Sequence, residues 1–391
     1  MTGTHQRVVV SMIDGLGTDY LAASSMPVLE RWSAEGVHAD VDAVLPTVTN
    51  ANNVSIICGA WPNEHGITGN SYYDQRAHRA EYMEDQGDIL MPTLIEAAAA
   101  HGVRSALLTS KKKTIRLMGR GAEIALAAEE PDAEYVRLLG PAPDIYSCEI
   151  NYWLWRVATH ILKTRDDIGF VYVHTTDYPM HMWPPAAEQS RAHLAELDRL
   201  MGEAAAAAPD AAFLVTADHG MNEKTRCWDL ARACAARGRP LRFGLSAERD
   251  RYVKHHRTFG GTAWVWLNDP SELDATRSMI AGLEGVEEVL TREQAAARFN
   301  LLPARIGDLV VLGDRDTVFG ELPDGELEQL GPGFRTHGSL HETRVPLVIH
   351  NFAGTLPAAS SFTANLHLTR HTIAPWWYGD VPATGTLAAA R

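Results

Sequence analysis

Three apolar segments with the composition of buried strands each end in an aspartate. These are residues 8–13 with Asp14, residues 168–174 with Asp177, and residues 212–217 with Asp218. Histidines stand close to two of them, since His181 lies four residues after Asp177 and His219 directly follows Asp218. A single aspartate after a strand is typically a helix cap or turn former, whereas three of them, two with a histidine nearby, favour a shared chemical role.

Carboxylates and imidazoles in this pattern predict a metal centre. The carboxyl ends of parallel strands lie at one edge of a sheet, so these side chains would converge there. Asp oxygens and neutral His nitrogens suit Zn²⁺, and also Mn²⁺ or Fe²⁺. With His337 the chain offers three carboxylates and three imidazoles. These are too many ligands for one catalytic zinc ion and make two sites of about three protein ligands each, with one further ligand to be identified. A threonine hydroxyl is a candidate, because a bound metal lowers its pKa.

Thr47 and Thr49 precede an apolar run, residues 52–58, that predicts a buried helix. A threonine at such a junction is first of all a helix cap, because its oxygen accepts from the unpaired N–H groups of the first turn. The same place suits a nucleophile, since those N–H groups and the helix dipole stabilise a developing negative charge. The local sequence favours the cap and leaves the nucleophile open.

A run of three lysines, Lys111, Lys112 and Lys113, follows the predicted strand at residues 104–109. Such a run is usually a solvated turn. Here, however, it stands at the carboxyl end of a strand, where open α/β sheets bind ligands. Alternation along an extended segment would place Lys111 and Lys113 on one side and Lys112 on the other.

Charge and composition argue against several classes of protein. The chain has 391 residues, is 46% hydrophobic and carries a formal net charge of −14. That charge argues against a nucleic-acid or anionic-membrane binder, but not against a small anionic substrate. No stretch approaches the roughly 18 apolar residues of a membrane span, and no signal-peptide pattern is present. Four cysteines without a CxxC pair indicate free thiols, and we expect a cytoplasmic protein, with a homodimer left open.

The order of the predicted elements indicates an α/β fold with an inserted segment. We expect a catalytic core from residues 1–240 and 331–391, and a small α+β cap from residues 241–330. Within the core, helices are predicted at about residues 22–35, 92–101 and 185–206, and residues 71–92 are predicted to be irregular.

The side chains at the strand ends resemble those of the two-zinc hydrolases of the alkaline phosphatase superfamily. The block from Pro46 to Asn70 is similar to the P-T-x-T-x-x-N opening and H-G-I-x-x-N close of the nucleotide pyrophosphatase/phosphodiesterase branch. Its spacing of 21 residues from Thr49 to Asn70 matches the nucleophile and the oxyanion-binding asparagine of that branch, which selects Thr49 over Thr47. The resemblance implies an alkaline phosphatase-like core with a mostly parallel sheet flanked by helices. It also implies two zinc ions, one held by Asp177, His181 and His337, the other by Asp14, Thr49, Asp218 and His219.

A closer resemblance, spanning nearly the whole chain, is to the phosphonoacetate hydrolases. It rests on segments such as Thr109–Lys113, Thr216–Asn222, Tyr252–His256 and Arg305–Val311. The resemblance implies cleavage of the C–P bond of phosphonoacetate to acetate and phosphate, through a zinc-bound Thr49 nucleophile and a phosphothreonine intermediate. Asn70 would hold a phosphoryl oxygen, and Lys111 and Lys113 the substrate carboxylate. Of the adjacent His255 and His256 at most one faces a site, and we assign His256 to the substrate.

Other functions stay open at this point. A nucleotide pyrophosphatase/phosphodiesterase or a phosphomonoesterase of the same superfamily would use the same metal ligands. Trp61, Tyr72 and Tyr73 could stack on a nucleotide base, although such rings are more often core or rim residues. A more distant alternative is a non-catalytic protein that binds metals and anions. His174, inside a predicted strand, is either a core histidine or a hydrogen-bond partner of a metal ligand.

Overall fold

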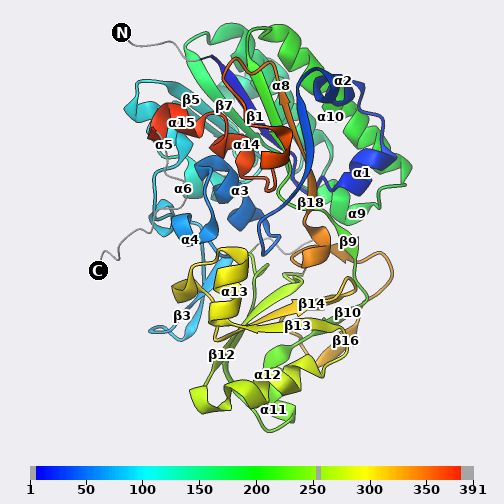
Figure 1. Ribbon diagram of the computed structural model, residues 1–391. Coiled ribbons are helices and arrows are strands. Elements are labelled where there is room, and N and C mark those ends of the chain that lie inside the picture. The colour runs from blue at the N-terminus through cyan, green and yellow to red at the C-terminus, as the bar shows by residue number, and fades with distance from the viewer. Residues whose placement is uncertain (1–5, 252–256, 380–391) are drawn as a thin grey trace.

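The computed structural model describes residues 6–251 and 257–379 and has a seven-stranded sheet as its centre (Figure 1). The strands lie in the order β2-β18-β8-β1-β7-β5-β6. The central strands pair in parallel, and β18 runs antiparallel to β2 and β8. A mostly parallel α/β sheet is therefore confirmed. In the same order, the bounds are Val37–Asp42, Arg344–His350, Ala212–Thr216, Val8–Met12, Ile168–His174, Arg104–Thr109 and Ile124–Ala127.

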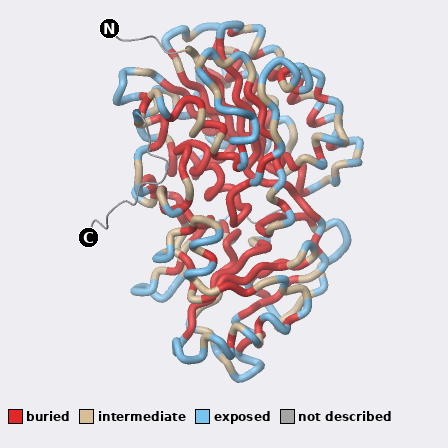
Figure 2. Tube along the Cα trace, in the orientation of Figure 1, coloured by how far each residue is buried: buried red, intermediate tan, exposed pale blue. Residues whose placement is uncertain are grey.

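Helices cover both faces of this sheet. One group packs together as α2 (Pro27–Glu35), α8 (Glu149–Thr164) and α10 (Glu188–Ala207). The other group, in front of the sheet in Figure 1, is α3 (Thr49–Cys58), α5 (Leu94–Ala100), α14 (His367–Arg370) and α15 (Ala374–Tyr378). Strands covered on both faces are typically near-continuous apolar runs, and every residue of β1 and β8 is buried. Figure 2 shows this buried interior as a continuous layer.

Three neighbouring strands, β8, β1 and β7, end level with one another. Met12 at the end of β1 stands beside Thr216 of β8 on one side and His174 of β7 on the other. The residues that follow these strands are thereby brought to one edge of the sheet. This register is what positions the predicted metal ligands.

A smaller unit lies beyond this edge (Figure 1). Its four-stranded antiparallel sheet has the order β11-β12-β14-β13, with bounds Leu241–Ser246, Thr262–Leu267, Leu309–Gly313 and Val286–Thr291. Beside it lie α11 (Leu230–Ala236), α12 (Leu273–Ala281), α13 (Arg292–Phe299) and a three-stranded sheet of β15 (Thr317–Phe319), β10 (Arg226–Trp228) and β16 (Leu327–Gln329).

The apolar core of this unit also contains residues before position 241. Trp228, Leu230, Ala233 and Cys234 pack in one cluster with residues of β12 and β14. We therefore propose that the insertion begins near Arg226 rather than at residue 241.

Local chemistry explains where some predicted elements differ. The helix predicted at residues 22–35 is two helices, α1 (Thr18–Ala23) and α2, because Pro27 starts a new helix. Residues 71–92, predicted to be irregular, contain the hairpin of β3 (Ser71–Asp74) and β4 (Arg79–Tyr82). The long amphipathic helix α8 was not predicted.

The cysteines have no disulfide partner, and all four are free. Burial raises the pKa of Cys148 to about 11 and that of Cys234 to about 12. These thiols stay protonated at neutral pH and are poor nucleophiles. No helix among the described residues combines the length and the apolar composition needed to cross a bilayer.

Candidate active site and metal centre

The three strand-end aspartates are all buried at the edge formed by β8, β1 and β7. Asp14 and Asp218 lie two residues beyond the ends of β1 and β8. Asp177 precedes the short helix α9 (Tyr178–Met182), whose turn brings His181 back toward it. The Asp177 Oδ2 and the His181 Nε2 are 2.7 Å apart.

Asp218 is fixed by its backbone surroundings. Its Oδ1 accepts hydrogen bonds from the backbone N–H groups of Gly15 and His219, each at 3.0 Å. Its Oδ2 lies 3.2 Å from the His219 Nε2, and the Asp14 Oδ1 lies 3.6 Å from that same nitrogen. Asp14, Asp218 and His219 thus form one compact group of potential metal ligands.

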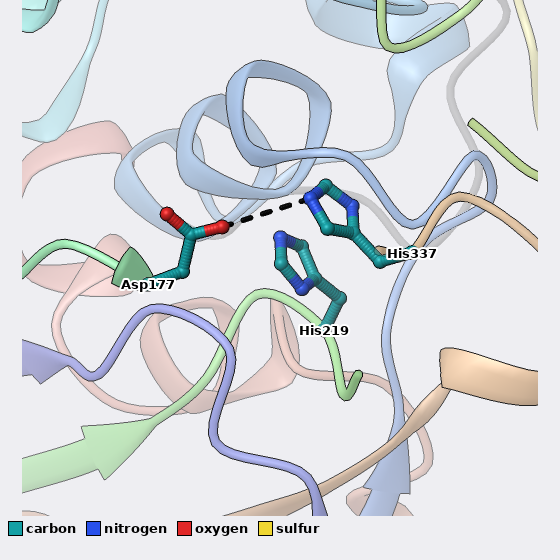
Figure 3. Close-up of side chains that lie close together, drawn as sticks. All are labelled: Asp177, His219 and His337. Atoms are coloured by element: carbon teal, nitrogen blue, oxygen red, sulfur yellow. Dashed lines mark ion pairs between the residues drawn. The ribbon is translucent and has the colours of Figure 1, made fainter. Parts of the chain in front are cut away.

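A second compact group contains Asp177, His219 and His337 (Figure 3). The His337 Nε2 is 3.7 Å from the Asp177 Oδ2. The His219 and His337 rings are stacked, with centroids 3.5 Å apart. His219 therefore belongs to both groups, whereas the family resemblance places it with Asp14 and Asp218 only. His181 lies at the edge of the second group through its contact with Asp177.

Each of the three imidazoles is oriented by a backbone carbonyl. A carbonyl oxygen only accepts, so each Nδ1 that contacts one carries a proton, and the Nε2 of each ring is turned toward the buried carboxylates. Burial lowers the pKa of His219 and of His337, which keeps both rings neutral. The Nδ1-to-carbonyl distances are 2.6 Å for His181 to Arg335, 2.9 Å for His219 to Gly220 and 2.7 Å for His337 to Thr47.

The charges of the site call for cations. Burial, together with the negative charges of Asp177 and Asp218, raises the pKa of Asp14 to about 7. Burial and the charge of Asp177 likewise raise the pKa of Asp218 to about 6. Lys111 contributes one positive charge, 3.9 Å from Asp177. Buried carboxylates that repel one another, with imidazole lone pairs beside them, fit two divalent ions with oxygen and nitrogen ligands.

Thr49 is the first residue of α3, and its Oγ1 lies 3.5 Å from the His219 Nε2. No side chain caps this helix, whose N-cap residue is Val48. The cap interpretation of Thr49 is therefore wrong, because its hydroxyl faces the metal-ligand group. The Thr47 hydroxyl contacts the Gly338–Ser339 backbone instead.

Asn70 lies against the start of α3. Its Oδ1 accepts from the Asn50 N–H at 3.2 Å, and its Nδ2 is 3.4 Å from the Glu248 carbonyl oxygen. Its amide therefore lies beside the first N–H groups of the helix that begins at Thr49. These are suitable donors for an oxygen that gains negative charge.

The lysines divide into two buried residues and one exposed residue. Lys111 and Lys113 are 5% and 3% exposed, whereas the exposed Lys112 pairs with Glu130 at 2.6 Å. The cause is not alternation along a strand, since α6 (Lys112–Met118) begins at this point. Burial lowers the pKa of Lys111, but the neighbouring carboxylates of Asp177 and Asp14 outweigh it and raise that pKa.

Two buried carboxylates near the lysines were missed from the sequence. Glu248 and Asp250 follow β11, and Asp250 pairs with Lys113. The Glu248 Oε2 is 3.7 Å from the His337 Nδ1, and burial and the charge of Asp250 raise the pKa of Glu248. Two acids spaced by one residue after a strand were the available signal. His256 lies outside the described residues.

His174 extends the centre by one hydrogen bond. Its Nε2 is 3.3 Å from the Asp14 Oδ2. Its Nδ1 contacts the Asn53 Nδ2 at 3.0 Å and the Thr109 Oγ1 at 3.1 Å. His174 is thus both a buried core histidine and a partner of a predicted metal ligand.

The fold and the site together define a hydrolase of the alkaline phosphatase type, with clusters of residues suited to metal ions. The family model for type I phosphodiesterase / nucleotide pyrophosphatase matches residues 8–340. The chain belongs to this family.

Solved structures agree over nearly the whole chain. Phosphonoacetate hydrolase from Sinorhizobium meliloti 1021, solved in complexes with phosphonoacetate and with phosphonoformate, has a TM-score of 0.83 and 28% identity, covering 93% of this chain and 94% of that one. Human ectonucleotide pyrophosphatase / phosphodiesterase 5 has a TM-score of 0.67 and 15% identity, covering 98% of this chain and 97% of that one. The second similarity shows the fold alone.

Curated relatives match over shorter stretches. Bis(5'-adenosyl)-triphosphatase of Xenopus laevis is 32% identical over 80 residues, covering 20% of this chain and 18% of the relative. The bovine (Bos taurus) protein of that name is 25% identical over 227 residues, covering 56% of this chain and 48% of the relative. The matched stretches thus span less than half the length of these relatives.

Proposed function

We propose that the chain hydrolyses the C–P bond of phosphonoacetate, giving acetate and phosphate. The observation that carries this proposal is the placement of Lys111 and Lys113, both buried, with Lys111 directly beside Asp177 of the candidate metal centre. A metal centre suits the phosphonate at one end of a small substrate, and two lysines close to that centre suit a carboxylate at the other end. The similarity to a phosphonoacetate hydrolase that was solved with phosphonoacetate supports the same substrate.

The residues fit a mechanism with a covalent intermediate. The Thr49 hydroxyl gives up its proton to solvent as its oxygen forms a bond to phosphorus, and the C–P bond breaks with its electron pair leaving on the carbon next to the carboxylate. The resulting acetate enediolate takes its proton from water, and ammonium groups near its carboxylate stabilise the developing charge. Asn70 and the N–H groups at the start of α3 hold a phosphoryl oxygen. Attack by water on phosphothreonine 49 then releases phosphate.

The ligand sets in this proposal are those implied by the resemblance. Asp177, His181 and His337 would hold one ion, and Asp14, Thr49, Asp218 and His219 the other. When bound, two divalent ions supply Lewis acidity at phosphorus and lower the pKa of a hydroxyl or a water. We propose zinc, for which Mn²⁺ or Fe²⁺ could substitute. Four free thiols support a reducing, cytoplasmic location.

A second candidate function, hydrolysis of a nucleotide diester, is favoured by the family model. Two of the three aromatic side chains considered for base stacking argue against it, whereas the third, Tyr72, is only half-buried. Tyr73 is buried and stacked on Phe243, with centroids 4.3 Å apart, and Trp61 contacts His367 edge-on at 5.9 Å. These two rings are engaged in packing.

A comparison of substrates tests the proposal. The zinc-loaded protein is assayed with phosphonoacetate, 2-aminoethylphosphonate, p-nitrophenyl phosphate and a nucleotide diester. We expect phosphonoacetate to be hydrolysed faster than the others by orders of magnitude in kcat/KM. Faster release from the diester would refute the proposal and favour the second function. Two bound metals without turnover of any substrate would indicate a metal- and anion-binding protein instead.

Three further variants assign the roles of the residues. Thr49→Ala should abolish turnover, and an active Thr49→Ala protein would mean that the nucleophile is misassigned. Lys111→Ala and Lys113→Ala should mainly raise KM for phosphonoacetate, by about 10-fold to 100-fold for a lost charge-assisted contact of roughly 1.5–3 kcal/mol. Lys112→Ala is the matched control, because Lys112 is exposed and pairs with Glu130.

A further inference from the structure

Thr47 makes three hydrogen bonds to the segment that carries His337. Its hydroxyl donates to the Ser339 carbonyl at 2.9 Å and accepts from the Gly338 N–H at 3.0 Å. Its own carbonyl accepts from the His337 Nδ1 at 2.7 Å. Thr47 is fully buried, so no solvent replaces these bonds if the hydroxyl is removed.

The segment His337–Ser339 is held from its other side by the inserted unit. The Gly261 N–H donates to the His337 carbonyl at 3.0 Å, and the Thr262 hydroxyl donates to the Gly338 carbonyl at 2.5 Å. A side chain on Gly338, whose φ is +112°, would collide with the Gly261 nitrogen. The segment is therefore tightly enclosed, and Thr47 is its contact with the loop that leads to Thr49.

We propose that Thr47 is a positioning residue that fixes the ring of His337 for a metal ion and couples this ligand to the nucleophile loop. Because Thr47 lies two residues before Thr49, one short segment supplies the nucleophile and orients a ligand that is 290 positions away in sequence. This inference rests on the metal centre of the proposed function and adds a residue to it. It assigns to Thr47 a role different from that of Thr49.

The same contacts explain why the His337 nitrogen faces the cluster. With Nδ1 donating to the Thr47 carbonyl, the neutral ring presents Nε2, which lies 3.7 Å from the Asp177 Oδ2. If the hydroxyl of Thr47 is lost, the buried Gly338 N–H loses its acceptor and the buried Ser339 carbonyl loses a donor. We expect the segment to lose its fixed position on the Thr47 side, and the His337 ring to lose its fixed orientation with it.

The test compares Thr47→Val with Thr47→Ser. Valine keeps the shape and removes the hydroxyl, whereas serine keeps the hydroxyl. Zinc stoichiometry and affinity are measured on the chelated and reloaded proteins, without substrate. We expect Thr47→Val to bind one of two zinc ions about 10-fold to 100-fold more weakly, the usual effect of losing a partner that orients a ligand, and Thr47→Ser to restore the affinity. Thr159→Val is the matched control, since the buried Thr159 hydroxyl also donates to a carbonyl, that of Trp155 at 2.8 Å.

A spectroscopic measurement separates positioning from a general loss of structure. The nitrogen chemical shifts of His337 should report a proton on Nδ1 in the parent protein and in Thr47→Ser, and a mixture of ring forms in Thr47→Val. If Thr47→Val does not fold, the pair Thr47→Ala and Thr47→Ser repeats the comparison with smaller side chains. Full zinc affinity with unchanged His337 shifts in the variant that lacks the hydroxyl would overturn the inference. A parent protein that binds no zinc would instead contradict the proposed metal centre.

Discussion

Replacing Asp14 with asparagine should change stability in opposite directions with and without metal. Asp14 is fully buried among other carboxylates, and its pKa is raised from 3.8 to about 7. A carboxyl group whose pKa is higher in the folded state binds its proton more tightly there. It therefore opposes folding increasingly as the pH rises from about 4 to 7, and by a constant amount at higher pH. Asparagine has no proton to lose and is free of this penalty.

The size of the effect follows from the shift. A change from 3.8 to about 7, at about 1.4 kcal/mol per pKa unit, corresponds to roughly 4 kcal/mol at pH 8. The metal-free Asp14→Asn protein should therefore be more stable than the metal-free parent by up to about 4 kcal/mol at pH 8. The two should be nearly equal at pH 4. With metal bound the order should reverse, because the parent keeps a carboxylate ligand that the variant lacks.

Urea unfolding of both proteins at pH 8, 6 and 4, after chelation and after zinc loading, measures these differences. Comparing parent and variant at each pH cancels the effects of buried histidines such as His65, whose pKa is lowered to about 3 by burial. Asp198→Asn is a suitable control, because Asp198 is buried but accepts from the N–H groups of Val28 and Leu29, away from the cluster. A metal-free Asp14→Asn protein that is less stable than the parent at pH 8 would refute the reasoning about charge repulsion.

Two further predictions concern the other buried charges. Asp250→Asn removes a carboxylate that pairs with Lys113 and so competes with the substrate for it. Steady-state kinetics should therefore show a KM for phosphonoacetate that is several-fold lower. A raised KM would instead mean that Asp250 orients the lysine for the substrate. Lys224 and Glu342 form a fully buried ion pair at 2.8 Å. Neutralising either residue alone should lower the free energy of unfolding by about 3–5 kcal/mol, because the other charge is left buried without its partner. The double variant Lys224→Met with Glu342→Gln should lose much less free energy of unfolding than the two single variants added together. Additive losses in chemical denaturation would contradict this coupling.

The predicted ligands could be found from the sequence because strand ends in a parallel sheet share an edge. Asp14, Asp177 and Asp218 follow continuous apolar runs, which is the pattern of strands buried on both faces. The order of these strands was not predictable from such runs. The adjacency of β8, β1 and β7 is what brings the three carboxylates within reach of the same imidazoles.

Residues whose position depends on long-range packing escaped prediction. Glu248 and Asp250 follow β11 of the smaller unit, and nothing in their local sequence indicates that they lie near lysines more than a hundred positions earlier. The cap interpretation of Thr49 failed for a related reason. A local pattern shows that a hydroxyl stands at a helix start, but only the folded chain shows whether it faces its own helix or His219.

The buried charges near Lys113 also bear on how an acidic chain can take an anionic substrate. The net charge of −14 does not exclude a small anionic substrate, and Lys113 already has a carboxylate partner in Asp250. Under the proposed function, a substrate carboxylate that takes the place of Asp250 keeps Lys113 in a buried ion pair, so the lysine is not left as a bare buried charge. The exchange still removes this partner from the buried Asp250 carboxylate and strips water from the substrate carboxylate. It also implies selectivity, because a neutral group in the same place would leave Lys113 with Asp250 and gain nothing from the contact.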